Sequence, residues 1–155
     1  MENTDVEILL VEDNHDDEEL ALLAFKKNNI SNKIHVARDG VEALEYLFGS
    51  ADGNDLIDDH PKVILLDLKL PKVDGLEVLK RIKKHPKAKM IPVVVLTSSR
   101  EERDMLVSYN LGVNSYIQKP VDFHQFTDVV NQIGMYWLLL NKQPRQIVHI
   151  ENEMV

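Results

Sequence analysis

The sequence predicts an α/β protein with a doubly wound, five-stranded parallel sheet and helices on both faces. Short apolar segments rich in branched residues recur along the chain. Residues 63–66 are typical, because four consecutive apolar residues suit a strand that is buried on both faces. Segments with apolar residues at helical spacing alternate with these strands. Strict alternation at this spacing implies parallel strands joined by right-handed crossovers.

The first two β-α units are marked by helix-capping residues. Strands are expected at 6–11 and 34–37. Asn14 suits the N-cap of a helix that runs to about Asn28, and the acids after it suit the positive end of the helix dipole. Asp39, with Glu42 three residues later, predicts a second helix that ends near Gly49. Residues 50–61 are polar and acidic, which indicates a surface loop.

The remaining three units follow the same pattern. Strands are expected at 63–66, 93–96 and 115–117, and helices at 74–84, 99–112 and 122–141. Pro86 ends the third helix, and Gly112 ends the fourth. The fifth helix is unusually long. We therefore expect one domain over residues 1–141, and the C-terminal extension at 142–155 has no clear period.

Composition limits the classes of function. The 155 residues suggest one domain, and 44% hydrophobic residues are enough for a core. The absence of cysteine excludes disulfides and thiolate metal sites, and it fits a reducing compartment. Neither a bilayer-spanning apolar segment nor a signal peptide is visible. The net charge of -8 argues against general nucleic-acid binding. We expect a cytoplasmic protein that binds neither membranes nor nucleic acid.

Carboxylates follow two strands that the predicted topology places side by side. Five such units favour the strand order 2-1-3-4-5, in which the first and third strands are neighbours. Glu12, Asp13 and Asp67 then meet at the carboxyl edge of the sheet. Glu12 and Asp13 could instead only open the first helix. Together, however, three carboxylates repel one another unless a cation offsets them, and oxygen ligands favour Mg²⁺.

Two further polar residues lie at the same edge. Thr97 follows the fourth strand, and Lys119 follows the fifth. Carboxylates, a hydroxyl, a lysine and a metal ion together suit a site that stabilises a phosphoryl group. Asp67, at the centre, would be the nucleophile, as carboxylates are in aspartyl-phosphate chemistry.

These residues resemble the receiver domain of bacterial response regulators. The resemblance rests on Glu12-Asp13, Asp67, Thr97, Tyr116 and Lys119-Pro120 and covers about residues 6–128. It implies the flavodoxin-like fold and transfer of a phosphoryl group from a histidine kinase to Asp67. It also implies that Mg²⁺ or Mn²⁺ is held by the three carboxylates and the Lys69 backbone carbonyl.

The resemblance further assigns roles to the other matched residues. Thr97 and Tyr116 would be the switch pair, and Lys119 would contact the phosphate. Such a protein is a phosphoacceptor and not an enzyme, apart from its own phosphorylation and dephosphorylation. We also expect the Lys119–Pro120 peptide bond to be cis, which turns Lys119 into the site.

A finer resemblance connects the chain to the single-domain receivers that serve cyanobacterial and bacterial phytochromes. It rests on residues 62–71, 91–97, 119–123 and 136–138. It implies that the partner kinase is a phytochrome. Many receivers of this group carry Asn two residues after the acceptor, where this chain has Lys69.

Two other functions compete with this interpretation. A Mg²⁺-dependent phosphohydrolase of the haloacid-dehalogenase type also uses an Asp nucleophile, but it places a second Asp where this chain has Lys69. A degenerate receiver that only binds a partner would have lost key positions, and the key positions are all present.

The fifth helix predicts a homodimer. Phe126 and Val130 belong to a stripe that can pack on the sheet, whereas Val129, Tyr136 and Leu139 lie beyond it. The C-terminal extension could fold back over these residues. The alternative, which the resemblance supports, is a two-fold interface through the fourth helix, fifth strand, fifth helix and C-terminal extension.

Overall fold

The computed structural model describes residues 8–28, 34–50, 52–97, 104, 106, 110–113, 115–119 and 122–132. Within these residues, five parallel strands form one sheet in the order β2-β1-β3-β4-β5. The strands are β1 (Ile8–Val11), β2 (Ile34–Ala37), β3 (Val63–Asp67), β4 (Val93–Thr97) and β5 (Ser115–Gln118). The predicted fold class and strand order are confirmed. Strands β3 and β4 each extend one residue further than predicted, so both end on a polar residue.

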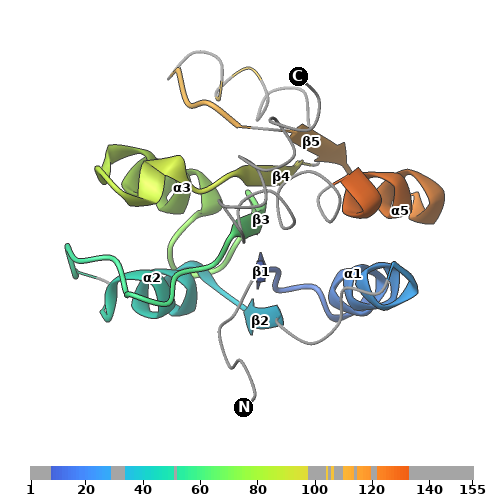
Figure 1. Ribbon diagram of the computed structural model, residues 1–155, viewed down its shortest axis with the longest axis horizontal. Coiled ribbons are helices and arrows are strands. Elements are labelled where there is room, and N and C mark those ends of the chain that lie inside the picture. The colour runs from blue at the N-terminus through green and yellow to red at the C-terminus, as the bar shows by residue number, and fades with distance from the viewer. Residues whose placement is uncertain are drawn as a thin grey trace, which may run out of the picture.

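Helices cover both faces of the sheet (Figure 1). On one face lie α2 (Gly40–Phe48) and α3 (Gly75–Lys84), and on the other lie α1 (His15–Lys27) and α5 (Phe123–Gln132). A short 3-10 helix, η1 (Ala88–Met90), follows α3 and was not predicted. None of the helices in the described residues is long and apolar enough to cross a bilayer.

Several predicted features fall outside the described residues. Of the predicted fourth helix at 99–112, only residues 104, 106 and 110–112 are described; 104 and 106 are helical, whereas 110–112 are not. The fifth helix is described as far as Gln132, so its expected continuation to 141 lies outside. The C-terminal extension at 142–155 and Pro120 also lie outside, and with them the expected cis peptide bond.

The caps of α1 and α2 form as the sequence predicts. The Asn14 side chain accepts a hydrogen bond from the Asp17 backbone N–H at 3.0 Å. Asp39 accepts one from the Glu42 N–H at 2.8 Å. Gly49 ends α2 with a φ of 81°, a conformation that glycine adopts without steric cost. Asp74 occupies the N-cap position of α3 but makes no side-chain cap hydrogen bond.

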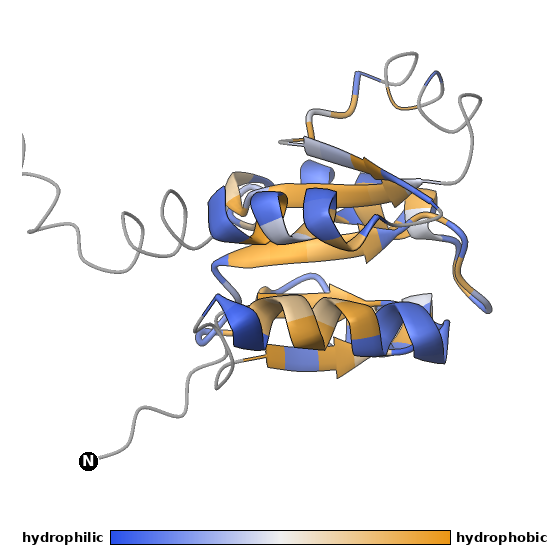
Figure 2. Cartoon of the chain, turned by 90° about the vertical axis from the view of Figure 1, so that its right-hand side faces the viewer, coloured by the Kyte–Doolittle hydropathy of each residue, from blue (hydrophilic) through white to orange (hydrophobic). Residues whose placement is uncertain are grey.

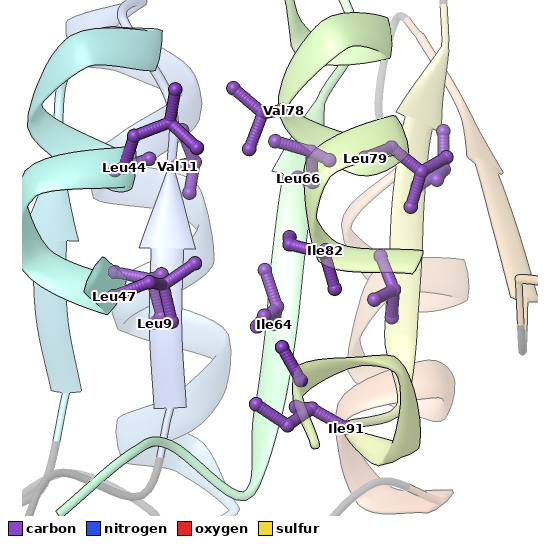
Figure 3. Close-up of a cluster of buried hydrophobic side chains, with 14 of the residues drawn as sticks. Leu9, Val11, Leu44, Leu47, Ile64, Leu66, Val78, Leu79, Ile82 and Ile91 are labelled. Carbon is purple, nitrogen blue, oxygen red and sulfur yellow. The ribbon is translucent and has the colours of Figure 1, made fainter. Parts of the chain in front are cut away.

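The alternation of side chains along the strands divides the core into two clusters. Leu9 and Val11 of β1 face α2 and α3, whereas Ile8 and Leu10 face α1 and α5. Figure 3 shows the first cluster, in which Leu and Ile side chains of α2 and α3 pack, together with Val78, on the side chains of β1 and β3. In Figure 2 the central strands are hydrophobic, the outer strands also carry polar residues, and the helices are polar on their outer sides. A sheet covered on both faces explains why continuous apolar segments, and not alternating ones, marked the strands.

The long connection between α2 and β3 packs against α3 at the amino-terminal edge of the sheet. Arg81 Nη2 donates a hydrogen bond to the Gly53 carbonyl at 2.7 Å, and its guanidinium lies over the Phe48 ring. His85 Nε2 lies 2.9 Å from the Asn54 carbonyl oxygen. The Nδ1 atom of the same ring accepts hydrogen bonds from the backbone N–H groups of residues 87 and 88. These contacts hold the loop to α3 and begin η1, and we call this region the α3 anchor.

Candidate functional site: an acidic rim at the carboxyl edge of the sheet

The carboxyl ends of β1 and β3 bring three acids together. Val11 pairs with Leu66, so the residues that follow them in each strand meet at one edge. Ligand oxygens of Glu12, Asp13 and Asp67 all lie within 4.8 Å of one another. Glu12 and Asp67 are buried, and Asp13 is exposed. The clustering that the sequence predicted is therefore present. We call these three carboxylates, with Lys119, the acidic rim.

Burial and like charge act on Glu12. The side chain is 1% exposed and lies beside Asp67. Burial, reinforced by the negative charge of Asp67, raises the pKa of Glu12 to about 8, and Lys119 only partly opposes the shift. One carboxyl group of the rim therefore holds a proton near neutral pH when no other cation is close. A divalent cation would favour the ionised form and would bind to three oxygen donors.

Lys119 supplies the positive charge of the rim. Its Nζ lies 2.8 Å from Asp67 Oδ2, 3.1 Å from Glu12 Oε1 and 2.9 Å from Asp17 Oδ2. Burial alone would lower the pKa of Lys119, but the hydrogen bonds and charges of Asp67, Asp17 and Glu12 raise it above its ordinary value. The ammonium is therefore charged at every physiological pH.

One contact of the rim was missed by the sequence analysis. Asp17 was interpreted only as an acid that suits the first turn of a helix, yet it is the third carboxylate on Lys119. The signal that could have found it is its place in the first turn of α1, because that turn directly follows Glu12 and Asp13 at the same edge of the sheet.

Two glycines at this edge are required by close backbone packing. A Cβ on Gly75 would lie 2.2 Å from the Asp67 carbonyl oxygen, and a Cβ on Gly40 would lie 1.9 Å from the Val73 carbonyl oxygen. The first contact brings the start of α3 against Asp67. The Lys69 backbone N–H donates to Asp67 Oδ1 at 2.9 Å, while the Lys69 residue is itself exposed. The loop after β3 therefore orients one oxygen of Asp67, and Lys119 orients the other.

The two switch residues predicted from the sequence occupy different environments. Thr97 is fully buried at the end of β4, and its carbonyl accepts a hydrogen bond from the Lys119 N–H at 2.9 Å. Tyr116 lies on β5, pairs with Val95 and not with Thr97, and is 37% exposed. Tyr116 therefore lies two residues short of the rim in register, at the outer strand of the sheet.

Comparison with known proteins identifies the family. Residues 8–131 match the model of the response regulator receiver domain. This chain belongs to the response regulator receiver family. The fold and the chemistry of the rim agree with that membership, which makes the protein a two-component signalling domain.

Two curated relatives cover most of the chain. A probable methanogenesis regulatory protein of Methanothrix harundinacea, FilR2, is 43% identical over 137 residues, which are 88% of this chain and 86% of the relative. The response regulator Rcp1 of Synechocystis is 42% identical over 131 residues, 84% of this chain and 88% of the relative.

Solved structures of similar receivers share the fold. The bacteriophytochrome response regulator RtBRR is 49% identical, with a TM-score of 0.72, over 85% of this chain and 80% of that chain. The phosphorylated cyanobacterial phytochrome response regulator RcpA is 42% identical, with a TM-score of 0.70, over 86% and 94%. The Mn²⁺-bound form of Rcp1 is 41% identical, with a TM-score of 0.69, over the same shares.

Proposed function

We propose that Asp67 accepts a phosphoryl group from the phosphohistidine of a sensor histidine kinase. The observation that carries this proposal is the geometry of Asp67, a buried carboxylate at the end of the central strand. Its Oδ1 is held by the Lys69 N–H and its Oδ2 by Lys119. In the reaction a carboxylate oxygen of Asp67 bonds to phosphorus while the phosphorus–nitrogen bond of the kinase breaks.

The rim would hold Mg²⁺ or Mn²⁺ through Glu12, Asp13, Asp67 and the Lys69 carbonyl. The donors fit a hard divalent ion, because all of them are oxygens and a cation would offset the carboxylate repulsion that raises the pKa of Glu12. The Mn²⁺-bound form of the relative Rcp1 supports the same ion class. The metal, when bound, neutralises charge on the transferred phosphoryl oxygens.

Residues of this chain perform the remaining steps. Lys119 places its ammonium against the same oxygens, and the Thr97 hydroxyl binds the phosphoryl group once it is on Asp67. When Thr97 moves toward the phosphate, space opens for the Tyr116 ring to turn inward, which changes the surface around β5. The domain is a signalling phosphoacceptor whose only chemistry is its own phosphorylation and dephosphorylation.

The kinase partner is proposed to be a phytochrome. The names of two similar structures support this proposal. RtBRR is called a bacteriophytochrome response regulator, and RcpA is called a cyanobacterial phytochrome response regulator. FilR2, at 43% identity, carries a different name, so similarity of this degree also occurs outside that group. The test therefore needs a second kinase that is not a phytochrome.

The proposal also covers the domain organisation and the oligomeric state. Residues 1–141 form the receiver domain with a long fifth helix, and 142–155 form an extension. A homodimer uses the fourth helix, β5, the fifth helix and this extension. Val129 packs against the cluster formed by α1 and α5, although the sequence predicted it to lie beyond that stripe, and it supports the dimer only by the part of its side chain that stays exposed. The protein acts in the cytoplasm and binds neither nucleic acid nor membrane, in keeping with its charge of -8.

Phosphotransfer with labelled kinase tests the central step. Incubation with an autophosphorylated phytochrome kinase and Mg²⁺ should move the label to this protein, and Asp67→Asn should receive none. Asp16→Asn, at an exposed acid of α1, is the matched control and should be labelled normally. Equal labelling of Asp67→Asn would disprove the assignment, and faster transfer from an unrelated histidine kinase would disprove the phytochrome partner.

Sedimentation tests the dimer. We expect dimers at micromolar concentration that become tighter with a phosphate mimic on Asp67. A monomer under both conditions would rule the dimer out, whereas a dimer whose dissociation constant does not change would rule out only its coupling to phosphorylation.

A further inference from the structure

The loop between β3 and α3 is fastened to a different element, the start of α2. This loop, residues 68–74, carries Lys69, whose N–H already holds Asp67 Oδ1. At its far end, the Gly75 N–H donates to the Leu68 carbonyl at 3.0 Å, which closes the loop on itself. Leu68 also joins the core and donates its N–H to the Leu96 carbonyl at 3.1 Å, which holds the start of the loop. The part of the loop that follows is in contact with the start of α2.

Three consecutive loop residues contact the first two residues of that neighbour. The Lys72 ammonium lies 3.3 Å from Asp39 Oδ2. The Gly40 N–H donates a long hydrogen bond of 3.4 Å to the Pro71 carbonyl. The Val73 carbonyl oxygen lies so close to Gly40 that a side-chain carbon there would be only 1.9 Å away. The loop thus lies directly on the backbone of Asp39 and Gly40.

Lys72 holds an uncommon backbone conformation in this contact. Its φ is 67°, in the left-handed region that few residues other than glycine adopt. A lysine in this region needs surrounding contacts to keep it there. The ion pair to Asp39 and the neighbouring contacts of Pro71 and Val73 supply them.

The two carboxylate oxygens of Asp39 contact different partners. Oδ1 accepts the Glu42 N–H and caps α2, while Oδ2 faces Lys72. The pKa of Asp39 lies below its ordinary value, chiefly because of the Glu42 hydrogen bond and further because of Lys72. The carboxylate is therefore charged at neutral pH, and it is buried, with 6% of its surface exposed.

We propose that Asp39, Gly40 and Lys72 form a clasp that positions the β3–α3 loop and thereby sets the affinity of the rim for divalent metal. The inference rests on the proposed function, because the Lys69 carbonyl of this loop is one of the proposed metal ligands. The clasp residues are positioning residues, since none of them belongs to the acidic rim. A loop released from α2 would hold that carbonyl in many positions and bind metal more weakly.

The test measures Mn²⁺ dissociation constants by electron paramagnetic resonance of the free ion, alongside thermal unfolding without metal. Asp39→Asn keeps the acceptor for the Glu42 N–H but loses the charge, and Lys72→Met keeps the length of the side chain. Because the pair is partly exposed on the lysine side, each should weaken Mn²⁺ binding by roughly two- to fivefold. The double variant should bind Mn²⁺ no more weakly than either single variant, and Lys72→Arg should bind Mn²⁺ like the wild type.

Gly40→Ala should have a larger effect, about tenfold or more, because its methyl group would displace the Val73 carbonyl. Gly112→Ala is the matched control, since nothing lies within 4 Å of the added carbon there. Should Gly40→Ala fail to fold, Asp39→Asn and Lys72→Met still decide the question, because neither adds bulk.

The outcomes separate the clasp from the proposed function. A wild-type protein that binds no Mn²⁺ would overturn the metal site itself. Wild-type binding with unchanged affinity in Asp39→Asn and Lys72→Met would overturn the clasp alone. The clasp would also be overturned if the loss of affinity followed only the fall in melting temperature, with Gly112→Ala and Lys72→Arg affected to the same degree.

Discussion

The two edges of the sheet treat their polar groups in opposite ways. At the α3 anchor, Arg81 and His85 meet backbone carbonyls and N–H groups, and every contact joins a donor to an acceptor. At the acidic rim, Glu12, Asp13 and Asp67 lie together around the one ammonium of Lys119. The anchor is electrostatically satisfied, whereas the rim keeps an excess of negative charge.

This difference separates groups that stabilise the fold from groups that await a ligand. Buried polar groups with partners contribute to stability, and like charges held together reduce it. A site that binds a cation needs an excess of negative charge before the cation arrives. If the charges were already balanced, the cation would have no repulsion between carboxylates to relieve. The four predictions below test this contrast, from the largest expected effect to the smallest.

Divalent metal should stabilise the protein only through the rim. At a Mg²⁺ concentration one hundred times the dissociation constant, the free energy of unfolding should rise by about 2.7 kcal/mol. Asp13→Asn should lose most of this gain, whereas His85→Ala should keep all of it. Thermal unfolding with and without Mg²⁺ measures both, and an equal gain in Asp13→Asn would contradict the contrast.

Removing the anchor should destabilise the fold without affecting the site. His85→Ala deprives two backbone N–H groups of their acceptor and leaves the Asn54 carbonyl without its partner. Because these bonds are partly exposed, we expect a loss of about 1.5 kcal/mol in urea unfolding. His124→Ala, at an exposed residue of α5, should cost much less. A change in Mn²⁺ affinity in His85→Ala would show that the two edges are coupled.

Removing the negative charge of Asp67 should stabilise the metal-free protein. Asp67→Asn takes away the charge that helps to raise the pKa of Glu12, while Lys119 keeps Glu12 and Asp17 as partners. We expect the metal-free variant to be more stable than the wild type by on the order of 1 kcal/mol. Urea unfolding in the presence of a chelator gives the value, and a clear loss of stability would show that the rim is balanced after all.

A paired acid beside the rim should behave like the anchor. The folded-state pKa of Asp39 lies below its ordinary value, so its charge contributes stability above about pH 4 that is lost as the pH falls through the lowered pKa. Asp39→Asn should therefore be about 0.5 kcal/mol less stable than the wild type at pH 7. The gap should narrow progressively as the pH falls below about 4. A gap that does not change with pH would assign the effect to the cap alone.

The sequence predicted most of the fold because each signal is local. Asn14 and Asp39 mark the starts of two helices, because short polar side chains accept hydrogen bonds from the first N–H groups of a helix. The apolar segments of β1, β3 and β4 were long enough to show burial on both faces. The 3-10 helix at Ala88–Met90 was not predicted, because its start depends on hydrogen bonds from two backbone N–H groups to the Nδ1 of His85. No periodic pattern marks a helix of one turn.

The acidic rim was predicted in its main members and missed in its surroundings. Glu12, Asp13, Asp67 and Lys119 stand at strand ends, and the order of strands alone brings such positions together. Asp17 on Lys119 and the pair of Lys72 with Asp39 were not predicted. Each depends on where a helix or a loop crosses the edge of the sheet.

The sequence by itself determined the strands, the helix caps and the kinds of side chain at the carboxyl edge, since residue type and spacing carry that information. Only the tertiary structure decided which oxygen of Asp67 faces Lys119, how far the pKa of Glu12 rises, and that the loop carrying Lys69 lies on the start of α2. These properties depend on distances of a few ångströms between segments far apart in the chain. Such distances are fixed only when the two clusters of the core pack against both faces of the sheet.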